Sequence, residues 1–520
     1  MNRRFFLRTA SWTGIVACGV SRGTPGGSHG TNVLFLCVDD LKPELGCYGD
    51  KRARTPEIDR LAASGVLFER QYVQQAICAP SRMSTFTGMR PDRTKVWDLK
   101  TYLLDVRPDA KTMQQVFRER GYETAGCGKV MHGARDEHPP SWSVPFGFDE
   151  SLPYDPAWPL PADGEYQDPR IRAVFAEMKK QGVKGWAARK KWMSEHGARP
   201  AYECLDVPDD AYSGGAMATW AIARLNRFAK ESKPFFLTIG FHRPHLPFVA
   251  PKKYWDLFDE SKIDLARFRK HAKNSPEYAY HTWGELRNYS GIPKQGDLPE
   301  DRQRKLIHAY LASVAYTDAQ IGRVLKALRE NGLERNTVVV LWGDHGWHLG
   351  DHGLWCKHSN FEQATRSPLI IRVPGLSRGG RVSSPVEAID VYPTLCELCG
   401  VPKPEVLEGR SLVPALRDSS VRVKEFAVSQ YPRTHVKLMG YAVRTDRYRL
   451  VLWMDESVAR TGKPDLSRVQ AAELYDYEKD PDETVSLAGN PEYAEVRKRL
   501  EGMLLSVFKF KEPPNVSPDT

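Results

Sequence analysis

Two kinds of hydrophobic pattern alternate along most of this chain. Short, nearly continuous apolar runs predict strands that are buried on both faces, as in a parallel sheet. Between them, apolar residues recur at three- and four-residue spacing, which predicts helices. The expected strands are 32–38, 122–127, 235–240, 337–342 and 369–373, and the expected helices are 58–67, 113–120, 216–230, 304–328 and 390–398. This alternation predicts an α/β fold, with a mostly parallel sheet flanked by helices.

The pattern changes near residue 417. Short strands are expected at 425–428, 440–444, 447–453 and 473–477, followed by a closing helix from Asn490 to about Phe508. Strands this close together favour an antiparallel sheet. We therefore expect a large domain at 31–417 and a smaller C-terminal α+β domain at 418–520. The Pro- and Trp-rich section 138–208 has little regular period, and we interpret it as an insertion or lid.

Residues 1–30 have the character of an export signal and tether. Arg3 and Arg4 precede a weakly apolar stretch that is too short to span a bilayer, which is typical of a twin-arginine signal. Residues 15–18 (Ile-Val-Ala-Cys) also resemble a bacterial lipobox, in which Cys18 carries a lipid. A plain signal cut nearby is the equal alternative. We expect export to the bacterial periplasm or cell envelope, with membrane attachment only through Cys18.

Composition limits the choice of partner. The chain has 520 residues, 41% of them hydrophobic and 27% charged, as in a soluble globular protein. Its formal net charge of +10 serves solubility or attracts an anionic partner. Without a Lys/Arg-rich run or a nucleic-acid-binding motif, a polyanionic substrate is favoured over DNA or RNA. The nine cysteines are irregularly spaced and predict neither a disulfide framework nor a zinc ribbon.

Polar residues follow four of the expected strands. They are Asp39-Asp40, Lys129, His242 and Asp344-His345. Ligands of such sheets bind beyond the carboxyl ends of the strands, so these residues should converge. A single carboxylate at such a place is usually a cap or loop anchor, but three hard oxygen donors together favour a divalent ion, with Ca²⁺ preferred over strictly octahedral Mg²⁺. His345 is an unusual donor for so hard a cation, and lies at the edge of the metal sphere or contacts the substrate.

Residues 78–82 (Cys-Ala-Pro-Ser-Arg), continued to Thr87-Gly88, suit a nucleophile at the start of a helix. Pro80 has the backbone angle of a first helical position, and the helix N-terminus stabilises an anion beside Cys78. Arg82 adds a planar cation one turn later. On residue type alone, Cys78 is either an activated thiolate or a buried structural cysteine.

The spelling Cys-x-Pro-Ser-Arg with the trailing Thr-Gly resembles the signature of type I sulfatases, in which this cysteine is oxidised to formylglycine and its hydrated aldehyde is the nucleophile. Other stretches resemble the iduronate-2-sulfatase subfamily, and the Asp-His pair at 344–345 is a mark of that subfamily. These stretches are 39–40, 45–50, 74–82, 128–132, 241–248, 344–353 and 355–361.

The resemblance implies an alkaline-phosphatase-like α/β catalytic domain and a Ca²⁺ ion held by Asp39, Asp40, Cys78 as formylglycine, Asp344 and His345. It also implies that Arg82 and Lys129 steady the hydrate, while the sulfate and leaving group are held by His132, His242 and Lys357. Fixed cations stabilise a sulfuryl group in transfer, and a histidine can protonate the departing oxygen. For His245, His348, His352 and His358 we prefer a core or solvated role.

The implied activity is hydrolysis of a sulfate ester, with a 2-O-sulfated uronic acid of glycosaminoglycan or a related polysaccharide as substrate and a formylglycine-generating enzyme as maturation partner. Arg243, Cys356 and His358 depart from the family pattern, and residues 163–199 have no counterpart. Two alternatives are a phosphonate or phosphate monoester hydrolase with the same core, and a non-catalytic glycan-binding lipoprotein with Cys78 unmodified.

Overall fold

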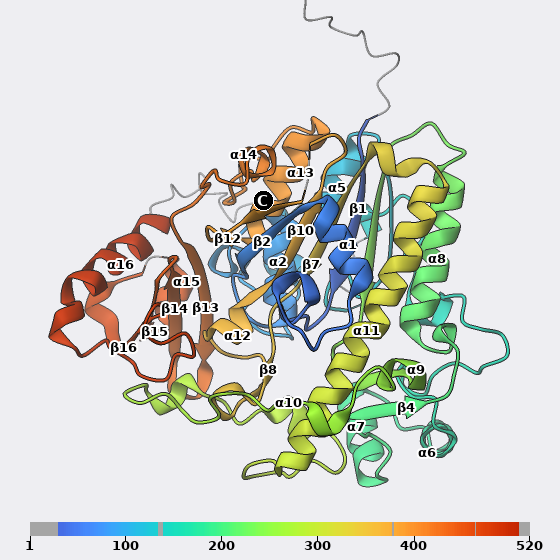
Figure 1. Cartoon of the computed structure of the whole chain (residues 1–520), viewed down its shortest axis with the longest axis horizontal. Helices are drawn as coiled ribbons and strands as arrows, with labels where there is room; N and C mark the ends of the chain where they lie inside the picture. The colour runs from blue at the N-terminus through green and yellow to red at the C-terminus, as the bar shows by residue number, and fades with distance from the viewer. Residues whose placement is uncertain (1–29, 134–138, 377–378, 463, 509–520) are drawn as a thin grey trace, which may run out of the picture.

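A mixed sheet forms the centre of the molecule. The computed structural model describes residues 30–133, 139–376, 379–462 and 464–508. Within them, an eight-stranded sheet has the order β11-β2-β10-β7-β1-β5-β3, with β12 paired to β2. Its strands are β1 (Asn32–Val38), β2 (Val66–Tyr72), β3 (Glu123–Gly128), β5 (Phe235–Phe241), β7 (Thr337–Gly343), β10 (Arg366–Arg372), β11 (Gly380–Val382) and β12 (Val386–Glu387). Figure 1 shows the sheet between two layers of helices.

Strand β1 is the middle of the parallel part. It pairs in parallel with β5 on one side and with β7 on the other. Only β10 runs antiparallel to its neighbours, β7 and β2, among the described strands of this sheet. The predicted mostly parallel sheet is therefore confirmed, and the run 32–38 is a strand with the predicted bounds. Because β1, β5 and β7 run in the same direction, their carboxyl ends lie at one edge of the sheet.

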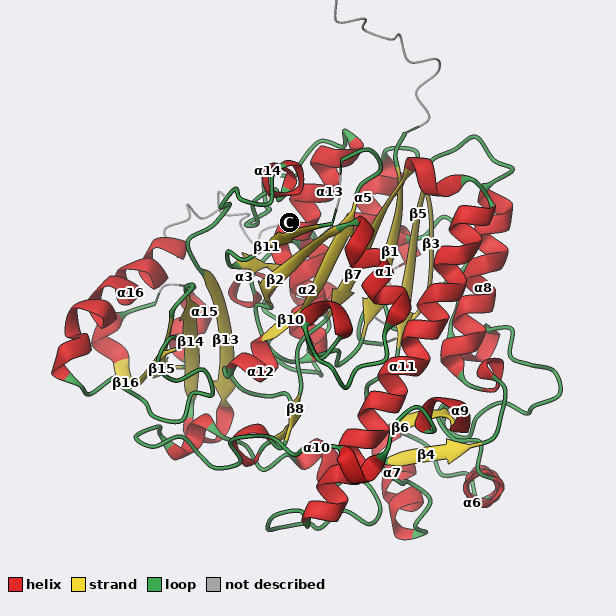
Figure 2. Ribbon diagram, in the orientation of Figure 1, coloured by secondary structure: helices red, strands yellow, loops and turns green. Residues whose placement is uncertain are grey.

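Alternate side chains of β1 enter two separate cores. Leu34 and Leu36 face the layer of α1 (Pro56–Ser64), α8 (Ser213–Phe228) and α11 (Glu300–Glu330). Val33 and Phe35 face the layer of α2 (Cys78–Thr87), α5 (Met113–Glu119) and α13 (Val391–Cys399). All four side chains are fully buried, as the apolar run predicts for a strand covered on both faces. Figure 2 shows the helices on either side of the yellow sheet.

Two sequence expectations are wrong. The helix expected over 58–67 ends at Ser64, and after Gly65 the chain becomes β2, because Val66 and Leu67 pair with β10. The section 138–208, expected to be irregular, contains α6 (Pro169–Lys180), α7 (Trp186–Glu195) and β4 (Tyr202–Leu205). The start of α6 carries ordinary signals, since Asp168 accepts a hydrogen bond from the backbone of Arg170 and proline follows the cap.

The C-terminal part has the predicted antiparallel sheet and closing helix. The sheet has the order β13-β14-β15-β16, formed by β13 (Ala427–Arg433), β14 (Leu438–Arg444), β15 (Tyr448–Asp455) and β16 (Val469–Asp476). Helix α16 (Ala494–Val507) buries Leu500 and Leu504 in a separate core with this sheet. Figure 1 shows this part in orange to red beside the large sheet.

Among the described helices, none is both long and apolar enough to cross a membrane. The paired arginines and Cys18 of the expected export signal lie outside the described residues.

Candidate active site

The carboxyl ends of the central strands bring the predicted aspartates together. Asp39 and Asp40 follow β1, and Asp344 follows β7. The backbone N–H of Asp344 donates to the Val38 carbonyl at 3.2 Å, and the backbone N–H of Asp40 donates to Oδ1 of Asp344 at 2.9 Å. Asp40 has a φ of 58°, a conformation that costs energy in a non-glycine residue and is frequent at functional sites. All three carboxylates are fully buried.

Cys78 lies against this carboxylate cluster at the first residue of α2. The helix begins at Cys78 itself, so Pro80 is its third residue. From the sequence, Pro80 was expected at the first helical position. The Cys78 Sγ atom lies 3.4 Å from Nε2 of His345, 3.5 Å from Nζ of Lys129 and 3.6 Å from Oδ1 of Asp39. Burial and the charge of Asp39 raise the pKa of the Cys78 thiol to about 12. The unmodified side chain is therefore a weak nucleophile at neutral pH.

Four of the five predicted metal ligands form one compact group. Donor atoms of Asp39, Asp40, Cys78 and His345 all lie within 4.8 Å of one another. Asp344 adjoins them, with Oδ2 3.5 Å from Nε2 of His345. Burial raises the pKa of Asp40 and, together with the charge of Asp39, that of Asp344. A divalent cation would relieve this repulsion, and the oxygen-rich donor set fits a hard cation.

Two cations hold the carboxylates from the side of α2 and β3. Arg82 is fully buried; it donates from Nε to Asp344 at 2.9 Å and from a terminal nitrogen to Asp39 at 3.2 Å. It also donates to the Val130 carbonyl at 2.9 Å. The Nζ of Lys129 forms a short ion pair with Asp39. Burial alone would raise the pKa of Asp39, but Lys129, His245 and Arg82 together outweigh burial and hold this pKa well below its usual value.

Lys357 contacts the cluster at Asp40. Its Nζ lies 3.0 Å from Oδ1 of Asp40 and 3.0 Å from Oε1 of Glu285. Glu285 also contacts Nε2 of His245 and of His358, each at 3.1 Å. Glu285, His245 and His358 form a second ring of residues around the cluster, which sequence reasoning missed. His245 could have been noticed because it lies close to the end of β5, and His358 because it follows Lys357. Glu285 lies in a segment with no recognisable motif.

The two histidines expected to handle the leaving group lie farther out. Among the described residues, no hydrogen bond or ion pair joins either histidine to Cys78 or to the three aspartates of the cluster. Nε2 of His242 pairs with Oδ1 of Asp149 at 3.2 Å. Nδ1 of His132 is buried without a hydrogen-bond partner among the described residues, and burial and the charge of Lys129 lower its pKa to about 3. His132 is thus neutral near pH 7.

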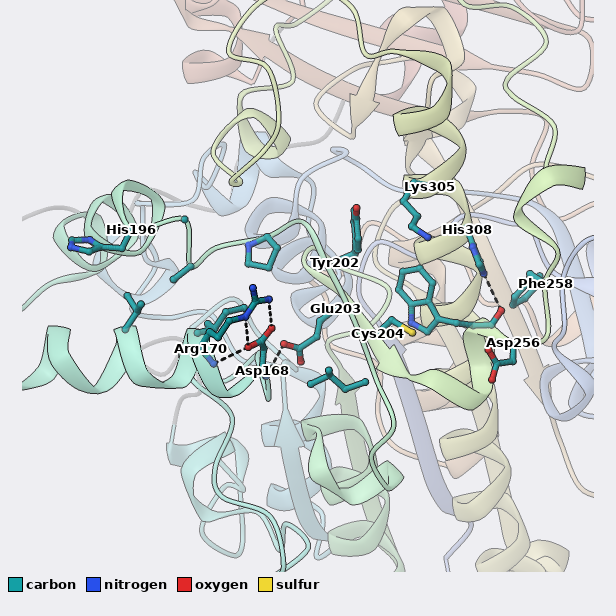
Figure 3. Close-up of a pocket in the computed structure, with 17 residues that line it drawn as sticks. Asp168, Arg170, His196, Tyr202, Glu203, Cys204, Asp256, Phe258, Lys305 and His308 are labelled. Carbon is teal, nitrogen blue, oxygen red and sulfur yellow. Dashed lines mark hydrogen bonds and ion pairs between the residues drawn. The ribbon is translucent and has the colours of Figure 1, made fainter.

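A cavity of about 770 Å³ lies elsewhere, between the insertion and α11 (Figure 3). None of the predicted site residues lines it. Its buried polar groups already have partners: Glu203 accepts from two backbone N–H groups and from the hydroxyl of Tyr212. Both ring nitrogens of His308 are also engaged, by Glu260 and the Trp255 carbonyl. The residues predicted to carry the chemistry therefore gather at the carboxylate cluster and not at this cavity.

Comparison with known proteins points to one family. The family model described as "Sulfatase" matches residues 31–401, and the model "N-sulphoglucosamine sulphohydrolase, C-terminal" matches residues 350–509. Iduronate 2-sulfatase of Homo sapiens is 33% identical to this chain, over 86% of this chain and 90% of that protein.

Solved structures share the fold. BT4656 in complex with D-glucosamine-2-N,6-O-disulfate superimposes with a TM-score of 0.71 at 20% identity, covering 93% of this chain and 99% of that one. The phosphonate monoester hydrolase of Agrobacterium radiobacter gives a TM-score of 0.68 at 23% identity, covering 92% and 95%. At these identities the likeness is one of fold alone.

Proposed function

This chain belongs to the sulfatase family and is a sulfuric ester hydrolase with the alkaline-phosphatase-like fold, and we propose that it removes 2-O-sulfate from uronic acid residues of glycosaminoglycan or a related sulfated polysaccharide. The observation that carries this proposal is the packing of Cys78 against Asp39 and His345, because these residues come from separate stretches that resemble the iduronate-2-sulfatase subfamily. The similarity to the human enzyme along most of both chains supports the same substrate class.

Residue 78 acts, in this proposal, as formylglycine. The family uses this residue with a divalent metal, and a hydrated aldehyde supplies the hydroxyl that attacks sulfur. Burial of the Cys78 thiol, with its pKa near 12, supports a nucleophile other than a thiolate. Ca²⁺ held by Asp39, Asp40, residue 78, Asp344 and His345 would neutralise anionic oxygens and lower the pKa of the attacking hydroxyl.

The side chains around residue 78 then have separate tasks. Arg82 fixes Asp39 and Asp344 by charge-assisted hydrogen bonds. Lys129, 3.5 Å from the Sγ atom, orients the nucleophile and offers a positive charge to the sulfate. Lys357, which contacts Asp40, stabilises charge on the sulfate oxygens.

Protonation of the leaving sugar oxygen falls to His242. The Asp149 carboxylate accepts a hydrogen bond from Nε2–H and orients the ring, and the imidazolium gives its Nδ1 proton to the leaving oxygen, which leaves the neutral ring with its remaining proton on Nε2. Because its pKa is about 3, His132 is neutral at pH 7 and offers a hydrogen bond from a neutral ring rather than a proton. We also propose export to the bacterial envelope after maturation by a formylglycine-generating enzyme.

The test is desulfation of defined sulfated disaccharides by the matured protein. A 2-O-sulfated uronate should be turned over faster than a glucosamine 6-O-sulfate, and Cys78→Ala should be inactive on both. Preference for the 6-O-sulfate, or for algal oligosaccharides alone, would contradict the proposed substrate. Mass spectrometry of the residue-78 peptide should show the mass loss of formylglycine relative to cysteine.

A phosphonate or phosphate monoester hydrolase is the second candidate, favoured by the shared fold with the Agrobacterium radiobacter enzyme. Side-by-side turnover of an aryl sulfate and an aryl phosphate separates the two. We expect the sulfate to be the better substrate by at least tenfold, and faster phosphate turnover would favour the alternative.

A further inference from the structure

Glu285 lies at the meeting point of three cationic or basic side chains. Its Oε1 atom contacts Nζ of Lys357 at 3.0 Å and Nε2 of His245 at 3.1 Å. Its Oε2 atom contacts Nε2 of His358 at 3.1 Å. Both carboxylate oxygens are therefore used, and each partner is held in a direction fixed by the carboxylate plane.

The segment that carries Lys357 needs such a constraint. Lys357 follows β9 (Trp355–Cys356), and its two neighbours both have left-handed backbones, with φ of 74° at Cys356 and 57° at His358. Such conformations cost energy in non-glycine residues and persist only where the surroundings enforce them. Glu285 contacts Lys357 and His358, and thus holds this strained turn through two successive side chains.

The backbone beside Glu285 is also constrained. It lies in α10 (Gly284–Arg287), and the residue before this helix, Trp283, has a φ of 41° and is buried. The next segment is tied down by Arg199, which donates to the Asn288 carbonyl at 2.8 Å and lies over the Tyr289 ring at 4.1 Å. Glu285 therefore presents its carboxylate from a fixed position and not from a free loop.

The charges lead to the same conclusion. Lys357 is almost completely buried, so its ammonium requires anionic partners. The two in contact are Asp40 and Glu285, and Asp40 also belongs to the proposed metal ligands. Glu285 is thus the anionic partner of Lys357 that lies outside the proposed metal ligands.

The network continues into the C-terminal sheet. Nδ1 of His358 lies 2.7 Å from the hydroxyl of Tyr431, which is on β13. Because Glu285 accepts the proton on Nε2 of His358, the Tyr431 hydroxyl donates to Nδ1. A continuous chain of polar contacts thus joins Asp40 to the antiparallel sheet.

We propose that Glu285 is a positioning residue for the sulfatase site: it fixes the ammonium of Lys357 and the imidazoles of His245 and His358, and couples the C-terminal sheet to them through Tyr431. This inference rests on the proposed function for the role of Lys357 toward the sulfate. Glu285 itself acts through these side chains and not on the ester.

The first test is Glu285→Gln, which keeps the shape and removes the charge. We expect kcat to fall by at least tenfold while KM changes by less than threefold, because a misplaced cation stabilises the transition state less. Glu362→Gln is the matched control: Glu362 is, like Glu285, a partly buried carboxylate of the same chain, but its ion pair is with Arg444 at 3.0 Å. The control should keep kcat within twofold. If Glu285→Gln also keeps kcat within twofold, the proposal is overturned.

Non-additivity tests whether Glu285 acts through Lys357. Combined with Lys357→Met, Glu285→Gln should cause no further loss of kcat beyond that of Lys357→Met alone. Multiplying losses would overturn the positioning role and indicate an independent one.

A readout without turnover separates this inference from the proposed function. Acetylation of Lys357 by acetic anhydride, followed by mass spectrometry, should be at least fivefold faster in Glu285→Gln than in the wild type and unchanged in Glu362→Gln. Equal rates in all three proteins would overturn the positioning role. If instead the proposed function is wrong, the wild-type protein will cleave no 2-O-sulfate.

Discussion

Replacing Glu362 by glutamine should reveal how much one carboxylate contributes to holding the two sheets together. Glu362 lies in α12 (Glu362–Thr365) and accepts a hydrogen bond from the hydroxyl of Tyr72, at the end of β2, at 2.8 Å. It also accepts from Arg444 of β14 at 3.0 Å. Its contacts therefore join the large sheet to the C-terminal sheet a few residues beyond Lys357.

The magnitude follows from the pKa of Glu362. Burial alone would raise this pKa, but Arg444, Arg366 and the hydrogen bond from Tyr72 together outweigh burial and lower it from 4.5 to about 2. A shift of about 2.5 units corresponds to roughly 3 kcal/mol of folding free energy. Since the folded-state pKa is the lower one, this contribution is present above pH 4.5 and is lost as the pH falls from 4.5 towards 2.

The assay is urea unfolding of the wild type and Glu362→Gln, followed by tryptophan fluorescence at several pH values. The variant should be less stable by roughly 3 kcal/mol at pH 7. The difference should shrink steadily below pH 4.5, because the wild-type carboxyl then becomes protonated. A difference that is absent at pH 7, or that stays constant down to pH 3, would refute the reasoning.

Three further predictions concern the active site. Cys78→Ala should abolish sulfate ester turnover and leave the melting temperature unchanged, and full activity would contradict the nucleophile assignment. Saturating Ca²⁺ should raise the melting temperature of chelator-treated wild type by roughly 5 °C, since it binds only the folded state. Asp344→Asn should lose most of this shift. Equal shifts of the melting temperature in the wild type and the variant would contradict the proposed metal site. Asp149→Asn should lower kcat roughly tenfold by freeing His242, whereas an unchanged kcat would assign the leaving-group proton elsewhere.

Much of the central sheet could be predicted because the hydrophobic pattern within each strand is enough to indicate that strand. The runs that became β1, β5 and β7 are apolar at nearly every position, so they indicate burial on both faces without knowledge of their neighbours. The polar residues after these runs were placed together by topology alone. Strand β2 was missed because Val66 and Leu67 continue the apolar spacing of the preceding helix, and what distinguishes them is their pairing with β10 and β11.

The second ring of residues around the cluster had no such local signal. Glu285 is one carboxylate in an irregular segment. Its importance comes from contacts with three residues that are separated from it by 40 to 73 positions along the chain. His245 and His358 could not be separated from ordinary core histidines on residue type. Their partners are set by tertiary packing, which a single sequence does not encode in any short pattern.

The burial of α2 bears on when the proposed maturation could take place. All ten residues of this helix are buried, and Cys78 is 2% exposed. Under the formylglycine proposal, an oxidising enzyme can reach this side chain only while the polypeptide is still unfolded. Competence is then decided on the nascent chain, and protein that folds with an unconverted cysteine stays inactive even if the maturation enzyme is supplied later.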